Sequence, residues 1–204
     1  MFLSDGKYLK PSKETRVLAI LDTLAEDGGV SQSELGRRLH LSGAMVNQYL
    51  RKLQDNQLVF FEPVNGKSYR YILTEKGEAS RREMFSAYSS EAVRFYSTVK
   101  MFVQQKMEEL ADAGAKRVVL FGASETCEVV LSALQSMPFQ VLLLLDNAPA
   151  RQGTFFHGYV VSPPSALETV ECDAVVITSF GKQDEIHQQL KPLSEKKGFK
   201  VMRF

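Results

Sequence analysis

The first third of the chain repeats apolar residues at the three- and four-residue steps that place them on one face of an amphipathic helix. Three such segments follow one another, and each begins at a serine that can cap a helix: Ser12, Ser31 and Ser42. Their apolar stripes are Val17, Leu18, Leu21 and Leu24; Leu35 and Leu39; and Val46, Leu50 and Leu53. The spacing predicts three helices, with a tight turn between the second and the third.

After the third helix the pattern changes to two β-rich runs within residues 58–73, separated by Asn65-Gly66. This dipeptide readily takes the positive φ angles of a type I′ turn, so the runs predict a β-hairpin. In the second helix, Glu34 stands three residues after Ser31 and can bond back to its amide, as in a capping box. Three helices followed by a hairpin is the order of a winged helix-turn-helix, which we place at residues 12–83.

Residues 84–113 contain neither proline nor glycine, so we expect a long connecting helix that Ser89-Ser90 could bend or divide. Apolar residues recur along it at alternating steps of three and four, the seam of a helix that packs lengthwise on another. The seam consists of Phe85, Tyr88, Ala92, Phe95, Val99 and Phe102. We expect residues 85–102 to form the interface of a homodimer. The alternative is packing of this seam within one chain.

From residue 115 to residue 204, short and continuously apolar runs alternate with helical segments. Strands of this kind are buried on both faces, which is typical of a parallel sheet with helices on each side. The strands are expected at residues 117–121, 140–146, 172–178 and 200–204, with an extra strand and a Pro-started helix within residues 156–167. The pattern predicts an α/β protein of two domains, the second a Rossmann-like parallel sheet.

Composition and charge narrow the class of protein only slightly. The net charge of +1 on 204 residues, with 44% apolar residues, is that of an ordinary globular chain, so DNA binding must rest on where basic groups lie. There is no run of about 18 apolar residues and no signal-peptide pattern, so we expect a cytoplasmic protein without membrane contact. Cys127 and Cys172 lack metal-ligand spacing, and no metal site is expected.

The order of helices, the hairpin and the following LTEKG segment resemble MarR-type winged-helix regulators over residues 14–82. The resemblance implies double-stranded DNA as a partner, with the third helix in the major groove. Four residues on its outward face can read base edges: Ala44, Asn47, Gln48 and Arg51. Three more are expected to hold phosphates: Arg38, Ser42 and Lys67 at the hairpin tip. The alternative is a winged helix that binds only protein.

A candidate ligand site follows the first strand of the second domain. The loop and helix start consist of Gly122, Ala123, Ser124, Glu125 and Thr126. Only the first glycine of a dinucleotide fingerprint is present, but free amides at the helix start and two hydroxyls can bond phosphate. Asp146 ends the next strand, where an acidic residue can hold a ribose, and Asn147 and Ser179 lie at strand ends that contact ligands in such domains. The alternative is a capped turn, with Asp146 capping its own loop.

Residues 116–204 also resemble small Rossmann-like modules, through the Asp-Asn pair after the second strand and the G-Y-V-V-x-P segment that follows. Such modules occur in redox-sensing Rex repressors and beside transferases that act on bacterial surface sugars. The resemblance implies a nucleotide-like ligand, either NAD(H) or a nucleotide-sugar, without naming the cofactor. The glycine-rich loop departs from the family pattern because Ser124 and Cys127 replace glycines.

The sequence offers no catalytic constellation, since Ser124 is outside a G-x-S-x-G turn and His157 and His187 stand without a partner in a defined position. The leading hypothesis is a dimeric DNA-binding regulator that senses a nucleotide-type metabolite and is not an enzyme. Two alternatives remain: a nucleotide-sugar-modifying enzyme with an accessory winged helix, and a protein-interaction scaffold.

Overall fold

The structure is a computed structural model that describes residues 10–65 and 68–204. The chain divides into two compact units between Val93 and Arg94. Each unit has its own hydrophobic core and is described by itself. Lys67, which was expected to hold a phosphate at the hairpin tip, lies outside the described residues.

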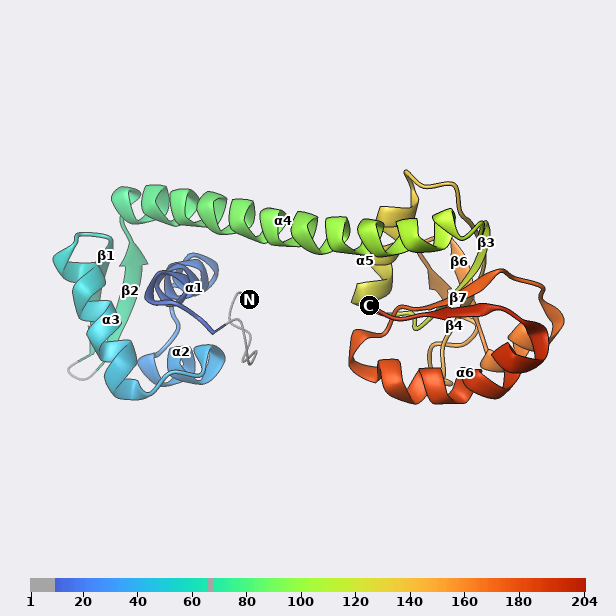
Figure 1. The fold of residues 1–204 in the computed structure, drawn as a ribbon. Helices are drawn as coiled ribbons and strands as arrows, with labels where there is room; N and C mark the ends of the chain where they lie inside the picture. The colour runs from blue at the N-terminus through green and yellow to red at the C-terminus, as the bar shows by residue number, and fades with distance from the viewer. Residues whose placement is uncertain (1–9, 66–67) are drawn as a thin grey trace. The chain divides into compact units, whose positions relative to one another are not determined.

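The first unit contains the three helices and the hairpin that the sequence predicted (Figure 1). The helices are α1 Lys13–Glu26, α2 Gln32–Leu39 and α3 Gly43–Asp55. Strands β1 Val59–Asn65 and β2 Ser68–Leu73 pair antiparallel. Each helix begins at its predicted serine, whose hydroxyl accepts the N–H three residues on, at 3.1 Å for Ser12, 3.1 Å for Ser31 and 3.3 Å for Ser42. The hydroxyl replaces a missing intrahelical partner, so all three helix starts are fixed locally.

The core of the first unit joins all three helices to the hairpin. Leu21 of α1, Leu35 of α2 and Leu50 of α3 are completely buried, and Val59 and Tyr71 close the core from the two strands. The apolar stripes therefore face one another as predicted. The opposite faces of the helices are left to solvent.

The connecting helix α4, Glu75–Asp112, is 38 residues long and runs without a break through Ser89-Ser90. It begins at Glu75, ahead of residue 84, because the Thr74 hydroxyl accepts the N–H of Gly77 at 2.9 Å and starts the helix directly after β2. Its last turns belong to the second unit, where Val103 and Met107 are fully buried. Every residue from 91 to 98 is exposed.

The second unit is a six-stranded sheet in the order β5-β6-β4-β3-β7-β8. Five strands are parallel, as predicted, and only β5 runs antiparallel to its neighbour β6. The strands are β3 Arg117–Phe121, β4 Gln140–Leu145, β5 Phe155–Phe156, β6 Tyr159–Ser162, β7 Ala174–Ile177 and β8 Lys200–Met202. The predicted Pro-started helix is a short 3-10 segment, η1 Pro164–Thr169.

Helices cover both faces of this sheet (Figure 1). Val118 and Leu120 of β3 face the end of α4 and helix α5, Glu125–Leu134. Val119 and Phe121 face helix α6, Gln183–Lys197. These last four of the five residues of β3 are at most 1% exposed, so β3 is a central strand. Its neighbours are β4 on one side and β7 on the other, and the chain changes direction across the sheet at the carboxyl end of β3.

Candidate nucleic-acid interface and ligand crevice

The outward face of α3 carries the residues that were expected to read bases. Ala44, Gln48 and Arg51 are exposed and Asn47 is half-buried. On the opposite face, Val46 and Leu50 are 0% exposed and Leu53 is 2% exposed. The helix is thus anchored by one apolar stripe and presents Ala44, Gln48 and Arg51 to solvent on the other side.

The turn between α2 and α3 is held tight by a glycine that the sequence analysis did not single out. A Cβ on Gly36 would lie 2.8 Å from the Leu41 carbonyl oxygen and 3.5 Å from Val46, so only glycine allows this approach. His40 ends α2 in the left-handed region, with φ of 54°, which turns the chain toward α3. The start of α3 is therefore fixed against α2.

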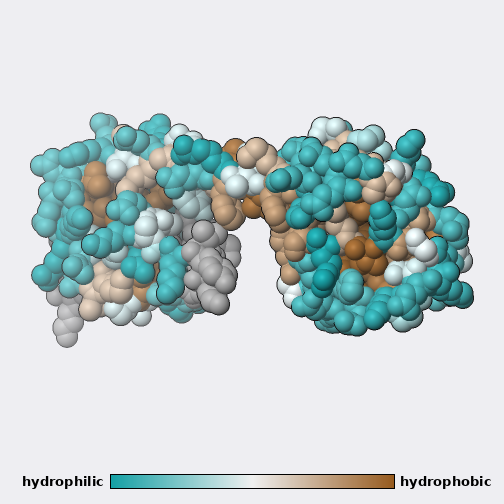
Figure 2. Space-filling model, viewed as in Figure 1, coloured by the Kyte–Doolittle hydropathy of each residue, from teal (hydrophilic) through white to brown (hydrophobic). Residues whose placement is uncertain are grey.

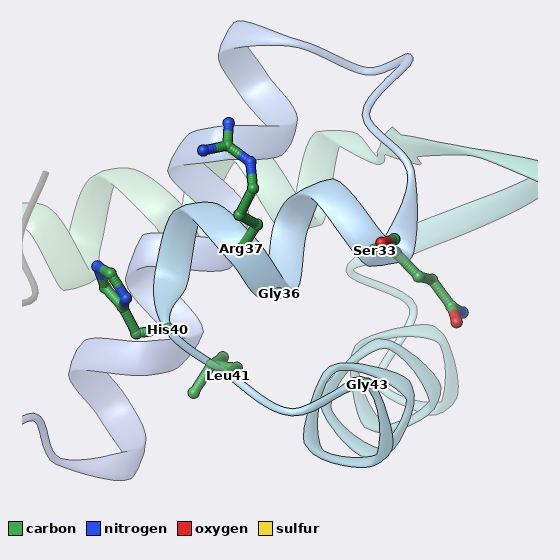
Figure 3. A pocket seen from close by; sticks show the side chains of 7 residues that line it. Ser33, Gly36, Arg37, His40, Leu41 and Gly43 are labelled. Carbon is green, nitrogen blue, oxygen red and sulfur yellow. The ribbon is translucent and has the colours of Figure 1, made fainter.

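An open hollow lies at this turn, between the end of α2 and the start of α3 (Figure 3). Figure 3 shows the Arg37 side chain extending outward from α2 and the His40 side chain extending outward from the end of this helix. Gly43 lies at the first turn of α3. The hollow is lined by Gln32, Ser33, Gly36, Arg37, His40, Leu41 and Gly43. The Arg37 side chain is 73% exposed, against 39% for Arg38. Arg37 is the more accessible cation, and the sequence analysis had assigned the phosphate contact to Arg38.

One carboxylate holds both arginines. Glu34 accepts from Arg37 Nε at 2.8 Å and Nη2 at 2.7 Å, and from Arg38 Nε at 2.8 Å. The two guanidinium groups lower the pKa of Glu34 from its ordinary 4.5 to about 2, chiefly through these hydrogen bonds. Arg38 also reaches Asp27 at 3.3 Å. The expected capping box is therefore half formed, since the Ser31 hydroxyl caps the helix while the Glu34 carboxylate serves the arginines instead.

In the second unit, Gly122 lies where three strands meet. Its N–H donates to Leu145 O at the end of β4 at 2.7 Å, and its carbonyl accepts from the Thr178 hydroxyl after β7 at 2.6 Å. Its φ is 118°, and a Cβ would lie 2.9 Å from Ser179 Cβ, so glycine is required on both counts. The predicted role of Gly122 in a tight turn agrees with this geometry.

Asp146 is buried, at 7% exposed, and both of its carboxylate oxygens are engaged within the protein. Oδ2 accepts the Ala123 N–H at 2.8 Å and Arg151 Nη1 at 3.1 Å, and Oδ1 accepts the Ala148 N–H at 2.8 Å. The carboxylate thus ties the loop after β3 to the loop after β4. This is the arrangement of a loop-organising aspartate, the alternative that the sequence left open beside a ribose contact.

Two other predicted ligand residues are also engaged. The Thr126 hydroxyl donates to the Thr178 carbonyl, which pins α5 to the end of β7, and it lies 2.9 Å from the Ser124 hydroxyl. Asn147 exchanges two amide hydrogen bonds with Gln189 of α6, at 2.8 Å and 3.0 Å. These side chains hold the walls of the site in place.

A crevice remains open at the carboxyl ends of β3, β4 and β7. It is lined by Phe121, Gly122, Ser124, Asp146, Asn147, Ala148, Arg151, Ser179, Lys182 and Ile186. Ala123, Ser124 and Glu125 also line an adjacent hollow with Glu128, Arg151, Thr154, Phe156 and Val161. Five predicted ligand residues therefore share one crevice, whereas Ala123 and Glu125 line only the second hollow and Thr126 lines neither.

Arg151 and Lys182 were missed by the sequence analysis. Each follows the carboxyl end of a parallel strand, β4 or β7, which is where ligands are contacted in open α/β sheets. That position, combined with a positive charge, is a signal the sequence already carried.

Other groups with reactive side chains are embedded or isolated. Burial raises the pKa of the Cys127 thiol to about 12, and burial also raises that of Cys172. His157 Nε2 lies 3.6 Å from Glu128 at the rim of the second hollow. Over residues 10–65 and 68–204, no group of three or more His, Cys, Asp or Glu side chains could hold a metal ion. In the same residues, no helix is long and apolar enough to cross a membrane.

Two protein families match separate parts of the chain. Residues 14–59 match the family described as winged helix-turn-helix DNA-binding, and residues 114–199 match the family described as C2185-like, N-terminal. The N-terminal region therefore carries a winged helix-turn-helix. The second match covers strands β3 to β7 with helices α5 and α6. No curated protein matches the chain.

Among solved structures, the chain is similar to MarR family regulators over about half of its length. A MarR family protein of Mycobacterium tuberculosis in complex with salicylic acid is 22% identical, over 48% of this chain and 74% of that chain, with a TM-score of 0.37. The PcaV transcriptional regulator of Streptomyces coelicolor is 20% identical, over 50% of this chain and 79% of that one, with a TM-score of 0.39. A MarR family regulator of Rhodococcus is 17% identical, over 52% and 73%, with a TM-score of 0.39.

Proposed function

We propose that this protein is a MarR-like, DNA-binding transcription regulator whose second unit senses a nucleotide-type metabolite. The observation that carries DNA binding is the face of α3, on which Ala44, Gln48 and Arg51 are exposed over a fully buried apolar stripe. A helix fits the major groove of B-DNA, where an arginine can pair with guanine and an amide with adenine. The match of residues 14–59 to a DNA-binding winged helix supports the same function.

Phosphate contacts in this proposal come from the hollow beside α3. Arg37 and His40 line it (Figure 3), and the Ser42 hydroxyl caps α3 next to Gly43, which also lines it. Backbone amides at the start of a helix favour an anion, and the exposed Arg37 guanidinium of α2 offers a separate contact for a phosphate. Arg38 is a second cation that can contact the phosphate backbone of DNA, although Asp27 and Glu34 already bind it.

Metabolite sensing is assigned to the crevice of the second unit, which we interpret as Rossmann-like. The strand order β6-β4-β3-β7-β8 places chain reversal beside β3, and ligands of open α/β sheets bind at this point. NAD(H) and a nucleotide-sugar are the two candidate classes. Occupancy would bias DNA affinity if the ligand binds more tightly to one of two states of the protein.

A homodimer through residues 85–102 completes the proposal. Several large apolar side chains in this part of α4 are exposed, including Phe95 at 57% and Tyr96 at 38%, and Figure 2 shows apolar surface in this part of the helix. Phe102 is 44% exposed but also contacts Phe204, so the end of the predicted seam packs partly within its own unit. Sedimentation of wild type and Phe95→Glu at micromolar concentration tests the interface. A dimer that Phe95→Glu converts to monomer supports it, and a monomeric wild type refutes it.

The DNA-binding proposal is tested by selecting genomic fragments on the full chain and titrating the selected duplex at low salt. Arg51→Gln is expected to weaken binding by about 1–3 kcal/mol and to relax preference at one base pair. Arg82→Gln removes the same charge from an exposed position on α4 and serves as the matched control. An equal loss of DNA affinity in both variants would show only a general effect of charge. If the selection yields no duplex that binds, the alternative of a protein-binding scaffold is favoured.

Mass spectrometry of small molecules retained by the native protein tests metabolite sensing. A retained nucleotide or nucleotide-sugar, added back to the stripped protein, is expected to change the affinity for the selected duplex. Steady conversion of that compound would instead favour the nucleotide-sugar-modifying enzyme.

A further inference from the structure

The polar groups left free in the crevice are almost all hydrogen-bond donors. Over residues 10–65 and 68–204, the Lys182 ammonium and the Ser179 hydroxyl make no hydrogen bond or ion pair, and both line the crevice. Toward the described part of the chain, the Arg151 guanidinium donates only through Nη1, to Asp146, and its side chain is 48% exposed. A guanidinium has five N–H donors, so most of those on Arg151 remain for another partner.

Three acceptors that line the same crevice already receive hydrogen bonds from the protein. The Asp146 carboxylate receives two backbone N–H groups and Arg151. The Asn147 amide oxygen receives Gln189, and the Gly122 carbonyl receives Thr178. A ligand seated here meets unpaired donors, and a buried or partly buried donor is satisfied best by an anionic acceptor.

Charge also separates this crevice from the adjacent hollow. The crevice is lined by two cations, Arg151 and Lys182, and one carboxylate, Asp146. The adjacent hollow is lined by Glu125 and Glu128 in the first turn of α5, against Arg151 alone. Those carboxylates oppose an anion on the hollow side of the α5 start, so the favourable place for negative charge is the crevice.

We propose that Arg151 and Lys182 form an anion clamp that holds the phosphate groups of the ligand from opposite sides of the Gly122 loop. This assignment rests on the metabolite-sensing part of the proposed function and deepens it. Arg151 comes from the loop after β4 and Lys182 from the segment after β7, and β3 lies between these two strands. Two cations and the Ser179 hydroxyl suit a phosphate, which carries more charge and more acceptor oxygens than a carboxylate. The Asp146 carboxylate positions Arg151 and does not itself contact ribose.

The clamp is tested by calorimetric titration of the full chain with inorganic pyrophosphate, ADP, adenosine and succinate. Pyrophosphate and ADP are expected to bind at least about tenfold more tightly than adenosine and succinate, because the cations select phosphate. Lys182→Gln and Arg151→Gln are each expected to weaken pyrophosphate binding by about tenfold. Lys191→Gln removes one positive charge from an exposed site on α6 and is expected to change binding less than twofold.

Lys182→Gln is the decisive variant, since its side chain holds no part of the described fold together. Unchanged pyrophosphate binding in Lys182→Gln, or an equal loss in Lys191→Gln, would overturn the clamp. Succinate binding as tightly as pyrophosphate would overturn the choice of phosphate, and a wild type that binds neither pyrophosphate nor ADP would overturn both. If the metabolite retained by the native protein binds Lys182→Gln normally, the clamp fails while metabolite sensing stands. DNA binding is measured separately through Arg51→Gln.

Discussion

The two units use their polar residues in opposite ways. On α3 of the first unit, the buried side is entirely apolar and Gln48 and Arg51 extend into solvent. In the second unit, Asp146 of the crevice and Thr126, which lies outside the crevice lining, bind the backbone of neighbouring loops. The outward face of α3 therefore keeps its polar side chains exposed to solvent. In the crevice of the second unit, most of the hydrogen-bonding groups already bind other parts of the protein.

This difference reflects how each site is built. A helix satisfies its own backbone, so outward side chains are free for a partner. Loops at the ends of parallel strands have no such internal pairing, and their N–H groups must find acceptors when buried. The Asp146 carboxylate supplies two of them, for Ala123 and Ala148. The groups that the proposed function assigns to ligand binding in the second unit are therefore those left over after the loops are satisfied.

The largest expected effect is on the stability of the first unit, when a glycine in close contact with backbone is substituted. It would show that the unit with the exposed α3 face depends on close packing between α4 and β1. A Cβ on Gly77 would lie 2.0 Å from the Leu58 carbonyl oxygen, where α4 starts against β1. Gly77→Ala is expected to lower the free energy of unfolding of the first unit by about 3 kcal/mol or more. Urea unfolding followed by circular dichroism measures it.

Gly43→Ala is the matched control, because nothing lies within 4 Å of a Cβ at this first residue of α3. It should be neutral or slightly stabilising, since alanine favours the helix. Equal stability of Gly77→Ala and Gly43→Ala would show that α4 does not start against β1 as described.

Asp146→Asn separates an organising role of this residue from a ligand-binding one. An amide in place of the carboxylate puts an NH₂ group against at least one of the Ala123, Ala148 and Arg151 donors, at a cost of about 2 kcal/mol in unfolding free energy. Asp184→Asn, at an exposed ion pair with Arg203, is expected to cost less than about 0.5 kcal/mol. Unfolding of both variants is compared in urea. A stable Asp146→Asn protein that loses only nucleotide affinity would restore the ribose contact.

The sequence predicted the elements of both units because their apolar periods differ: steps of three and four in α3, and continuous runs such as β3. It placed Asp146 correctly at the end of β4, and it left its role open. Asp146 binds the N–H of Ala123, which lies 23 residues before it in the chain. Thr126 donates to the carbonyl of Thr178, which lies 52 residues after Thr126. Pairings over such separations depend on strand order, which periodicity does not encode.

In the first unit too, sequence spacing did not predict a hydrogen-bond pairing, although the residues concerned are close together in the chain. The spacing of Ser31 and Glu34 suggested a capping box, but Arg37 and Arg38 lie one turn on and compete for the same carboxylate. A charged guanidinium is a stronger donor than the neutral Ser31 amide, so the ion pairs prevail. Sequence reasoning found the serine cap because the N–H that donates to the Ser31 hydroxyl is three residues away and has no rival donor.

The smallest expected effect concerns the Glu34 carboxylate, whose replacement would leave Arg37 and Arg38 more available to a partner. Glu34→Gln replaces the carboxylate that binds Arg37 and Arg38 with a neutral amide, which keeps one acceptor oxygen and deletes a negative charge beside the proposed phosphate contacts. Affinity for the selected duplex is expected to rise by about three- to tenfold at low salt, with a steeper dependence on salt concentration, because more cation is available to displace counterions from DNA. Anisotropy titrations at several salt concentrations measure both quantities.

Glu83→Gln makes the same change of charge at an exposed site on α4 and should alter the affinity less than twofold. A gain confined to Glu34→Gln would locate the phosphate backbone at the end of α2, next to the hollow lined by Arg37 and His40. Equal or weaker binding by Glu34→Gln would mean that Glu34 holds Arg37 and Arg38 in the geometry that DNA needs, and that the carboxylate orients these cations instead of masking them.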